Sequence, residues 1–188
     1  MAPPAGERRN AVFPDQINTL RLVLRPVAPP DAVPIFETYA QDPEVTRYLT
    51  WRPHRGIGDT HAYIAACLAA TTTRTYAITR RDGSALIGAF DLRRETPWRY
   101  GFGYVLARSA WGQGLMTEAL TAISAWALSQ PAIWRIGDVV DIENRASARV
   151  MEKSGLVLEG IRRRWGIHPN KGPEPRDCYS YARVKEPD

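Results

Sequence analysis

Trp111-Gly112-Gln113-Gly114-Leu115-Met116-Thr117-Glu118-Ala119 is the stretch of sequence that decides the fold. It follows a strand-like run, residues 100–106, and opens a helix-like run, residues 115–128. Two glycines at a strand-to-helix junction leave backbone N–H groups uncovered, and the helix adds its unpaired first-turn donors and the positive end of its dipole. This arrangement predicts a binding site for a phosphorylated ligand.

Two better-known phosphate-binding loops do not fit this stretch. No Gly-Lys-Ser or Gly-Lys-Thr follows it, which excludes the loop of nucleoside triphosphatases. The dinucleotide fingerprint needs a third glycine where Thr117 and Glu118 stand, and it needs a βαβ unit, whereas the preceding strands read as hairpins. A plain tight turn is the simplest alternative for the two glycines, but the strand before and the helix after favour a ligand site.

Composition is that of one globular domain. The chain has 188 residues, 44% of them hydrophobic and 24% charged. Residues 1–16 are rich in Pro, Ala and charge, so we expect a flexible tail there and one domain over residues 17–186. No run approaches the ~20 apolar residues that a bilayer needs, and residues 1–16 lack a signal-peptide core, which predicts a cytoplasmic protein without membrane contact. Cys67 and Cys178 match no metal spacing, which predicts reduced thiols and no metal site.

The net charge of +5 and the pI of about 9.5 suit a polyanionic partner or an anionic nucleotide-type cofactor. Residues 162–164 are three arginines that run into Trp165, which is similar to a basic and aromatic patch for nucleic acid. A strand edge that alternates between solvent and core explains this run more simply. Nucleic acid is therefore the minor alternative.

Periodicity and turn signals give the order of elements. Strands are predicted over residues 19–25, 74–80, 85–93, 99–107, 133–140, 156–167 and 177–184. Helices are predicted over residues 31–39, 59–70, 115–128 and 144–153, with a short helical turn at Asp42-Pro43. The first strand should bury Leu20, Leu22 and Leu24, and strand 133–140 should lie parallel to its predecessor because a helix connects them. The order predicts an α/β fold, a mixed sheet of about seven strands with about four helices on both faces.

Asn144 and Ser147 form a second candidate site. Asn144 follows a strand and begins a helix, so capping that helix is its simplest role. Ser147 lies about one turn further on, so the two side chains share a face. If that face lines a cofactor cleft, Asn144 can hydrogen-bond an amide-bearing arm and Ser147 can donate a hydrogen bond to a leaving sulfur.

The ordered set of motifs resembles the GNAT superfamily of N-acetyltransferases, in the branch similar to the RimJ/RimL ribosomal-protein N-terminal acetyltransferases. The resemblance extends from about residue 19 to residue 184 and is specific through the order and the gaps of its parts. The parts are residues 20–25, Leu86-Ile87-Gly88, Gly103-Tyr104, Trp111-Gly112-Gln113-Gly114, Thr117-Glu118-Ala119, Asn144 with Ser147, residues 152–156, Glu159-Gly160, and Asp177 with Tyr181.

The resemblance implies a GNAT (acyl-CoA N-acyltransferase) fold whose sheet is splayed open for acetyl-CoA, used as a cosubstrate without a metal. The pantetheine arm is expected to pair with the backbone of Val105 and Leu106, and the pyrophosphate to bind the N–H groups after residue 110. The expected cofactor-binding residues are Tyr104, Val105, Leu106, Trp111, Gly112, Gln113, Gly114, Leu115, Met116, Thr117, Asn144 and Ser147.

The implied reaction is direct transfer of the acetyl group to a primary amine, with Ser147 near the thiol as the catalytic residue and neither cysteine as a nucleophile. A backbone N–H near Val105 or Leu106 holds the thioester oxygen. The chain departs from the family at three places: Gly101 where many relatives carry an acid, Val150-Met151 where many carry a tyrosine, and Ser109 at the loop opening. The general base therefore stays open among Glu95, Asp91, His168 and Asp177.

The acceptor amine is either a protein N-terminus or a small molecule. Its pocket is expected from the first half of the chain, residues 38–63, and from the loop 165–176, with aromatic residues at Tyr48, Trp51, Trp98 and Trp165. The alternative is a GNAT-like protein without catalysis that binds coenzyme A or RNA, which the missing acid at Gly101 favours. Exposed strands at the C-terminus permit a homodimer.

Overall fold

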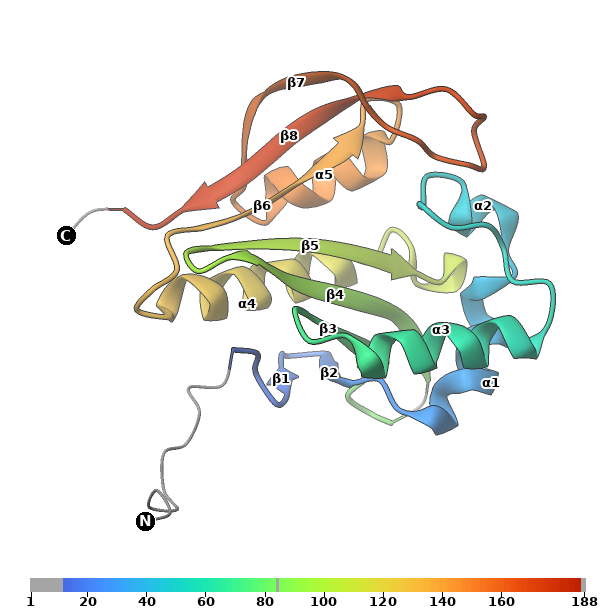
Figure 1. Cartoon of the computed structure of the whole chain (residues 1–188). Coiled ribbons are helices and arrows are strands. Elements are labelled where there is room, and N and C mark those ends of the chain that lie inside the picture. Colours follow the sequence, from blue (N-terminus) through green and yellow to red (C-terminus); the bar gives the residue numbers. More distant parts are fainter. Residues whose placement is uncertain (1–11, 84, 187–188) are drawn as a thin grey trace, which may run out of the picture.

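The structure, a computed structural model, describes residues 12–83 and 85–186. Its centre is one sheet of eight strands in the order β1-β2-β3-β4-β5-β6-β8-β7 (Figure 1). The strands are β1 (Ile17–Asn18), β2 (Leu22–Pro26), β3 (Thr73–Arg80), β4 (Leu86–Thr96), β5 (Arg99–Leu106), β6 (Arg135–Asp141), β7 (Val157–Gly166) and β8 (Arg176–Val184). The helices are α1 (Ala32–Ile35), α2 (Pro43–Thr46), α3 (Ile57–Ala69), α4 (Leu115–Ser129) and α5 (Arg145–Lys153).

Helices cover both faces of this mixed sheet, which confirms the predicted α/β class (Figure 1). A hydrophobic core lies on each face of the sheet. Alternate residues of β4 belong to one core or the other, because successive side chains of a strand point to opposite faces. Phe90 and Leu92 pack in the core that α4 and α5 cover, whereas Ala89 packs in the core beneath α1 and α3. The eighth strand is the two-residue β1, which the sequence had not indicated.

The first strand begins later than its alternation predicts. Leu22 and Leu24 are fully buried, but Leu20 is 83% exposed. The N–H of Thr19 donates to the carbonyl of Leu22, so this segment is the turn between β1 and β2. The prediction that Leu20 belongs to the inner face was therefore wrong, because a hairpin turn interrupts the period-two pattern.

The expected flexible tail is packed where the structure describes it. Phe13 is buried, and its ring lies 6.1 Å from that of Tyr100. The hydroxyl of Tyr76 donates a hydrogen bond of 2.6 Å to the carbonyl of Pro14. Residues 1–11 of the expected tail lie outside the described residues.

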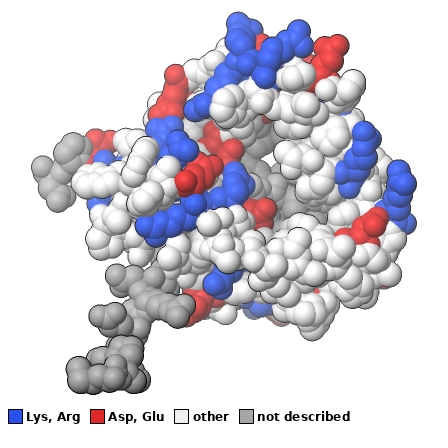
Figure 2. Space-filling view, viewed as in Figure 1, with Lys and Arg blue, Asp and Glu red and all other residues white. Residues whose placement is uncertain are grey.

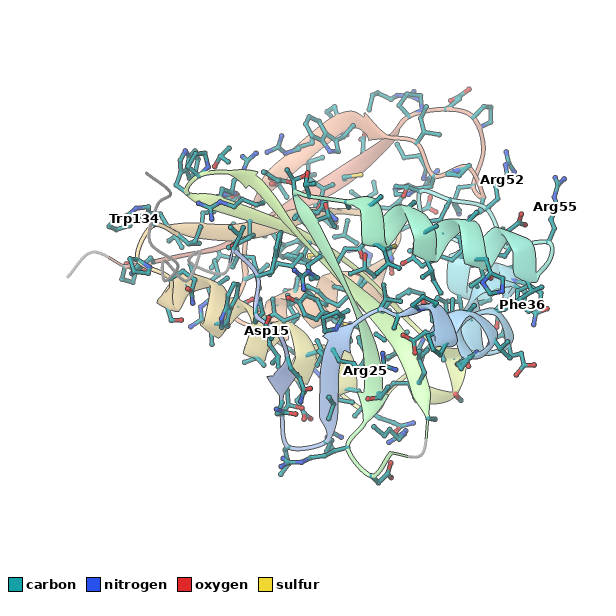
Figure 3. All side chains as sticks on the ribbon, turned by 60° about the horizontal axis from the view of Figure 1, so that its bottom comes forward. Asp15, Arg25, Phe36, Arg52, Arg55 and Trp134 are labelled. Carbon is teal, nitrogen blue, oxygen red and sulfur yellow. The ribbon has the colours of Figure 1, made fainter. Side chains whose placement is uncertain are left out.

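An ion pair between Arg25 and Asp31 stabilises the segment that leads from β2 into helix α1. Arg25 at the end of β2 pairs with the buried carboxylate of Asp31 at 2.6 Å, and Asp31 also accepts the N–H of Ala28 (Figure 3). Helix α1 follows at once and continues into a π-helical segment, Phe36–Ala40. Among the described residues, no helix has the length and apolar character needed to cross a membrane.

The two parallel strands in the middle of the sheet separate soon after they begin. β5 and β6 run parallel, as the helix between them predicted, but they pair only at Arg99 with Arg135 and at Tyr100 with Ile136. Beyond these positions β6 diverges from β5 together with β8 and β7 (Figure 1). The later part of β5 therefore has a free edge on the side that faces β6.

Candidate functional site

The glycine loop has the backbone that the sequence predicts. Gly112 and Gly114 have φ of 73° and 72°, in the left-handed region where glycine is favoured. Nothing lies within 4 Å of a Cβ placed on Gly112, so backbone conformation, not crowding, is the reason for this glycine. Gly114 is the N-cap of α4, and no side chain caps the helix there. The first-turn N–H groups are thus left for a ligand or for water.

Two arginines hold this loop, Arg21 in the turn before β2 and Arg80 at the end of β3. Arg21 donates to the carbonyl of Gln113 at 2.9 Å and pairs with Glu118 of α4 at 2.6 Å. Arg80 donates to the side-chain oxygen of Gln113 at 2.9 Å. Glu118 also accepts the hydroxyl of Thr19 at 2.6 Å. The loop is therefore tied to the first hairpin, and two cations lie beside its open N–H groups.

The register of the sheet decides which backbone groups of β5 face the open side. Ala107 donates to the carbonyl of Ile87, and a Cβ on Gly88 would lie 2.2 Å from the carbonyl oxygen of Val105. Val105 therefore pairs with β4, and its neighbours on either side, Tyr104 and Leu106, point away from β4. The expectation that Val105 offers its backbone to the cleft was wrong, and Tyr104 takes that place.

Ser147 and Tyr104 meet where α5 packs behind the open part of the sheet. The Tyr104 hydroxyl lies 2.7 Å from Oγ of Ser147. Burial raises the pKa of Tyr104, although the hydrogen bond to Ser147 opposes the shift, so the phenol stays protonated at neutral pH. Asn144 accepts the N–H of Ser147 at 3.2 Å, which confirms it as the cap of α5. No sequence pattern indicates the contact between the Tyr104 side chain and Ser147, because the two residues lie on separate elements.

An ion pair joins β4 to β6 across β5. Arg93 pairs with Asp138, and the same Arg93 nitrogen donates to the carbonyl of Phe102 at 2.6 Å. Asp138 accepts the N–H of Phe102 at 2.9 Å and that of Val139 at 2.7 Å. Both backbone groups of Phe102 on its β6 side are thus bonded to side chains. No local sequence signal marks this pair, because Arg93 and Asp138 are brought together only by the pairing of distant strands.

Two of the candidate bases lie on the face of the sheet opposite α4. Asp91 accepts the hydroxyl of Thr75 at 2.7 Å, and burial raises its pKa. Glu95 pairs with Arg99 at 2.9 Å and lines a cavity of about 210 Å³. The cavity is also lined by Arg99, Arg135, Gly137, Asp138, Val139, Arg162, Trp165 and Ser180.

The other two candidates lie further along the chain. His168 is 3.6 Å from Asp141 at the end of β6, and burial lowers the pKa of this histidine against the effect of Asp141. Asp177 accepts the N–H of Arg164 at 2.9 Å and pairs with Arg163 at 2.6 Å, and both contacts lower its pKa. Asp177 therefore holds the hairpin between β7 and β8 in shape.

The two segments expected to form the acceptor pocket do meet. Asn170, in the loop between β7 and β8, donates to the carbonyls of Thr46 and Trp51 at 2.7 and 2.8 Å. Figure 2 shows a hollow in this face of the molecule, with charged side chains gathered on one side of it. Arg52 and Arg55, in the loop before α3, extend outward from the same region (Figure 3).

The four aromatic residues do not line a single pocket. The ring of Trp51 lies 5.0 Å from that of His54, and the ring of Tyr48 lies 6.4 Å from that of His168. Trp98 is at the hairpin between β4 and β5 and is 47% exposed. The expectation of one aromatic pocket was therefore wrong, because these residues lie at different ends of the sheet.

The arginine triplet has partners within the protein. Arg163 pairs with Asp177, and Arg164 pairs with Glu174 at 3.3 Å. The guanidinium of Arg162 lies 4.4 Å from the ring centre of Trp165. The triplet lies in the edge strand β7, as the simpler of the two interpretations predicted, but residues 157–165 are all exposed, so the expected alternation between solvent and core is absent.

Proteins of similar sequence and fold identify the family to which this chain belongs. The sequence profile described as the acetyltransferase (GNAT) domain matches residues 21–157. The chain belongs to the GNAT acetyltransferase family. It is 30% identical over 175 residues to the uncharacterized N-acetyltransferase YoaA of Bacillus subtilis (strain 168), over 90% of this chain and 98% of that protein.

Two solved structures share the fold. One is a GNAT-family acetyltransferase from Bacillus anthracis, with a TM-score of 0.80 and 24% identity over 90% of this chain and 98% of that one. The other is RimL, an alpha-N-protein acetyltransferase of ribosomal L7/L12 in complex with coenzyme A, with a TM-score of 0.79 and 20% identity. The RimL match covers 90% of this chain and 97% of that one.

For a GNAT acetyltransferase, the glycine at position 101 has a local explanation. A Cβ placed on Gly101 would lie 2.2 Å from Oε1 of Glu95 and 2.7 Å from its carboxyl carbon. A side chain at this position would thus displace Glu95. The carboxylate beside this part of β5 comes from the neighbouring strand instead of from β5 itself.

The contact between Glu118 and the first hairpin predicts a pH-dependent contribution to stability. Burial raises the pKa of Glu118, but the hydrogen bonds from Thr19 and Arg21 outweigh it and the net shift is downward. A lowered carboxyl pKa stabilises the fold above the ordinary value and loses this effect as the pH falls through the folded value. We expect Glu118→Gln to reduce the free energy of unfolding at pH 7 by about 1 kcal/mol.

Urea unfolding at pH 7 and at about pH 3.5 measures this effect, and the difference from wild type should shrink at the lower pH. Glu44→Gln is the control, because Glu44 is 52% exposed and pairs with Arg47 at 3.4 Å. That variant should change the free energy of unfolding by less than about 0.5 kcal/mol. An equal loss for Glu118→Gln at both pH values would show that the carboxylate charge plays no part.

Proposed function

We propose that this GNAT protein transfers the acetyl group of acetyl-CoA directly to a primary amine and that acetyl-CoA binds between β5 and β6. The observation that carries the proposal is the divergence of these strands next to a loop with two left-handed glycines. A free strand edge and a loop of open N–H groups suit an amide-bearing arm and a pyrophosphate respectively. The solved structure of RimL, which shares the fold, contains coenzyme A bound to the protein.

The free edge of β5 matches the chemistry of the pantetheine arm. Tyr104 and Leu106 are the residues whose backbone faces away from β4 in the open part of the strand. Pantetheine has two amide groups, which can pair with these two residues as an added strand would. The pyrophosphate then reaches the N–H groups after Gly112, where Arg80 supplies positive charge and Arg21, already paired with Glu118, holds the loop.

Acetyl transfer in this site needs one proton removed and one supplied. The ammonium group of the acceptor gives a proton to a base, and the neutral amine then attacks the thioester carbonyl carbon. A C–N bond forms and the C–S bond breaks. The amine nitrogen then loses its second proton and the thiolate of coenzyme A takes up one, so the net reaction releases only the proton given to the base. The N–H of Tyr104 is placed to hold the carbonyl oxygen as negative charge develops on it.

Glu95 is the base that we infer. It lies against Gly101, the place on β5 where many relatives carry an acid, and it lines a cavity on that face of the sheet. Glu95 and Asp91 each have a side-chain partner, Arg99 and Thr75 respectively, but only Glu95 lines this cavity, so Asp91 is the less favoured choice. On the opposite face, Ser147 is positioned by the Tyr104 hydroxyl and can donate to the leaving thiolate.

The acceptor that we propose is either the α-amine of a protein or a small primary amine, which enters through the hollow in the face that Figure 2 shows. The two free thiols suit the cytoplasm as the compartment. RNA binding is disfavoured because Arg163 and Arg164 already have carboxylate partners.

Cosubstrate binding is the first test. Gly112→Asp should abolish acetyl-CoA binding in calorimetry, because its carboxylate would meet the pyrophosphate. Gly155→Asp is the matched control, since Gly155 also has a left-handed φ of 82° but lies at the end of α5. It should bind acetyl-CoA as wild type does. Wild-type protein that binds no acetyl-CoA would overturn the proposed function.

The assignment of the base is tested by the rate of transfer. Glu95→Gln should lower kcat by about a hundredfold, the usual size of general-base catalysis, with KM for acetyl-CoA unchanged. Asp91→Asn and Asp177→Asn are the comparison variants and should keep kcat within about threefold of wild type. A large loss in Asp91→Asn with none in Glu95→Gln would move the base to Asp91.

The role of Ser147 is tested in the same assay. Ser147→Ala should lower kcat by about tenfold, less than a typical general acid because a thiolate leaves readily. Tyr104→Phe should have a smaller effect, since it removes only the contact that orients Ser147. Unchanged kcat in Ser147→Ala would leave protonation of the thiolate to water.

A further inference from the structure

The pair of Arg93 and Asp138 occupies the point where the sheet opens. Arg93 belongs to β4 and Asp138 to β6, so their ion pair passes across β5. Gly103 permits this crossing, because a Cβ there would lie only 3.1 Å from Nη1 of Arg93. The two side chains are partly buried, with 34% and 17% of their surface exposed.

These two side chains take the place of a neighbouring strand. Phe102 is the next residue after Tyr100 whose N–H and C=O face β6, because alternate residues point to each side. Its N–H donates to Asp138 at 2.9 Å and its carbonyl accepts from Arg93 at 2.6 Å. Strands in direct pairing lie about 4.8 Å apart, and an ion pair inserted between them needs more room.

A second contact stiffens this arrangement. The other carboxylate oxygen of Asp138 accepts the N–H of the next residue, Val139, at 2.7 Å. Asp138 therefore has two backbone donors and one guanidinium around it. A carboxylate bonded in this way has little freedom to move, and exchange of this pair for water would leave several buried groups to be satisfied again.

We propose that the Arg93–Asp138 pair is a positioning wedge that ends the pairing of β5 with β6 at Phe102 and sets how deep the acyl end of the cosubstrate enters. The inference rests on the proposed acetyl-CoA site. Beyond the wedge, Tyr104 and Leu106 are the residues left for the pantetheine arm. The acyl group of the cosubstrate lies on the Phe102 side of Tyr104, where it meets the guanidinium of Arg93 and the carboxylate of Asp138. A short acyl chain therefore fits, and a longer one does not.

Acyl-chain selectivity is the readout that a merely structural ion pair would not change. Wild type should use acetyl-CoA in preference to butyryl-CoA by the ratio of kcat/KM values. The double variant Arg93→Ala/Asp138→Ala removes the wedge, and this preference should fall at least about tenfold. Arg94→Ala is the matched control, because Arg94 is the next arginine of β4 and its side chain donates to Pro97, away from β6. It should keep the wild-type preference.

A milder variant covers the case in which the double variant does not fold. Asp138→Asn keeps the shape of the side chain but weakens its hold on Arg93, so KM for acetyl-CoA should rise about fivefold while KM for the amine stays the same. A folded double variant with wild-type selectivity, or Asp138→Asn with a wild-type KM for acetyl-CoA, would overturn the wedge.

Hydrogen exchange separates this inference from the proposed function. The Phe102 amide should exchange slowly in wild type without any cosubstrate, and faster in Asp138→Asn, while the amides of α4 are unchanged. If wild type bound no acetyl-CoA, the proposed function would fail, and this exchange measurement alone would decide whether the wedge exists. Equal exchange of Phe102 in both proteins would overturn it.

Discussion

The early separation of β5 and β6 is the constraint on which the rest of the structure depends. Parallel neighbours usually pair along their whole length, but these two share only two residue pairs. The unpaired edge of β5 carries N–H and C=O groups that must find partners in water, in side chains or in a ligand. Arg93 and Asp138 satisfy the groups nearest the branch point, at Phe102. Further along, the carbonyl of Leu106 accepts the indole N–H of Trp111 at 2.7 Å, so the backbone groups of Tyr104 and the N–H of Leu106 are the ones left for a ligand in the proposed site.

One continuous segment builds both parts of the proposed cosubstrate site. β5 supplies the free edge, and the loop that follows it leads directly to the uncapped first turn of α4. The short connection between them sets the distance from edge to loop, with little dependence on the rest of the chain. What the rest of the chain adds is rigidity, since Arg21 and Glu118 tie the loop and helix to the first hairpin.

The two faces of the sheet have different roles in the proposed reaction. Ser147 and the Tyr104 hydroxyl lie on the face covered by α4 and α5, where the thiolate leaves. Glu95 lies on the other face, beside a cavity. In the proposed reaction, proton removal from the amine and proton donation to sulfur take place on opposite faces of the sheet.

Apart from the short β1 and its hairpin with β2, the sequence alone determined the order of strands and helices and the glycine loop between β5 and α4, since each depends on residues close together in the chain. It erred at Leu20, where a turn interrupted a regular alternation. Tertiary structure decided everything that needs register between distant strands: which residues of β5 face the cleft, and that Arg93 reaches Asp138. The physical reason is that a strand's pattern shows its two faces, whereas its edges are defined only by the strands that pair with it.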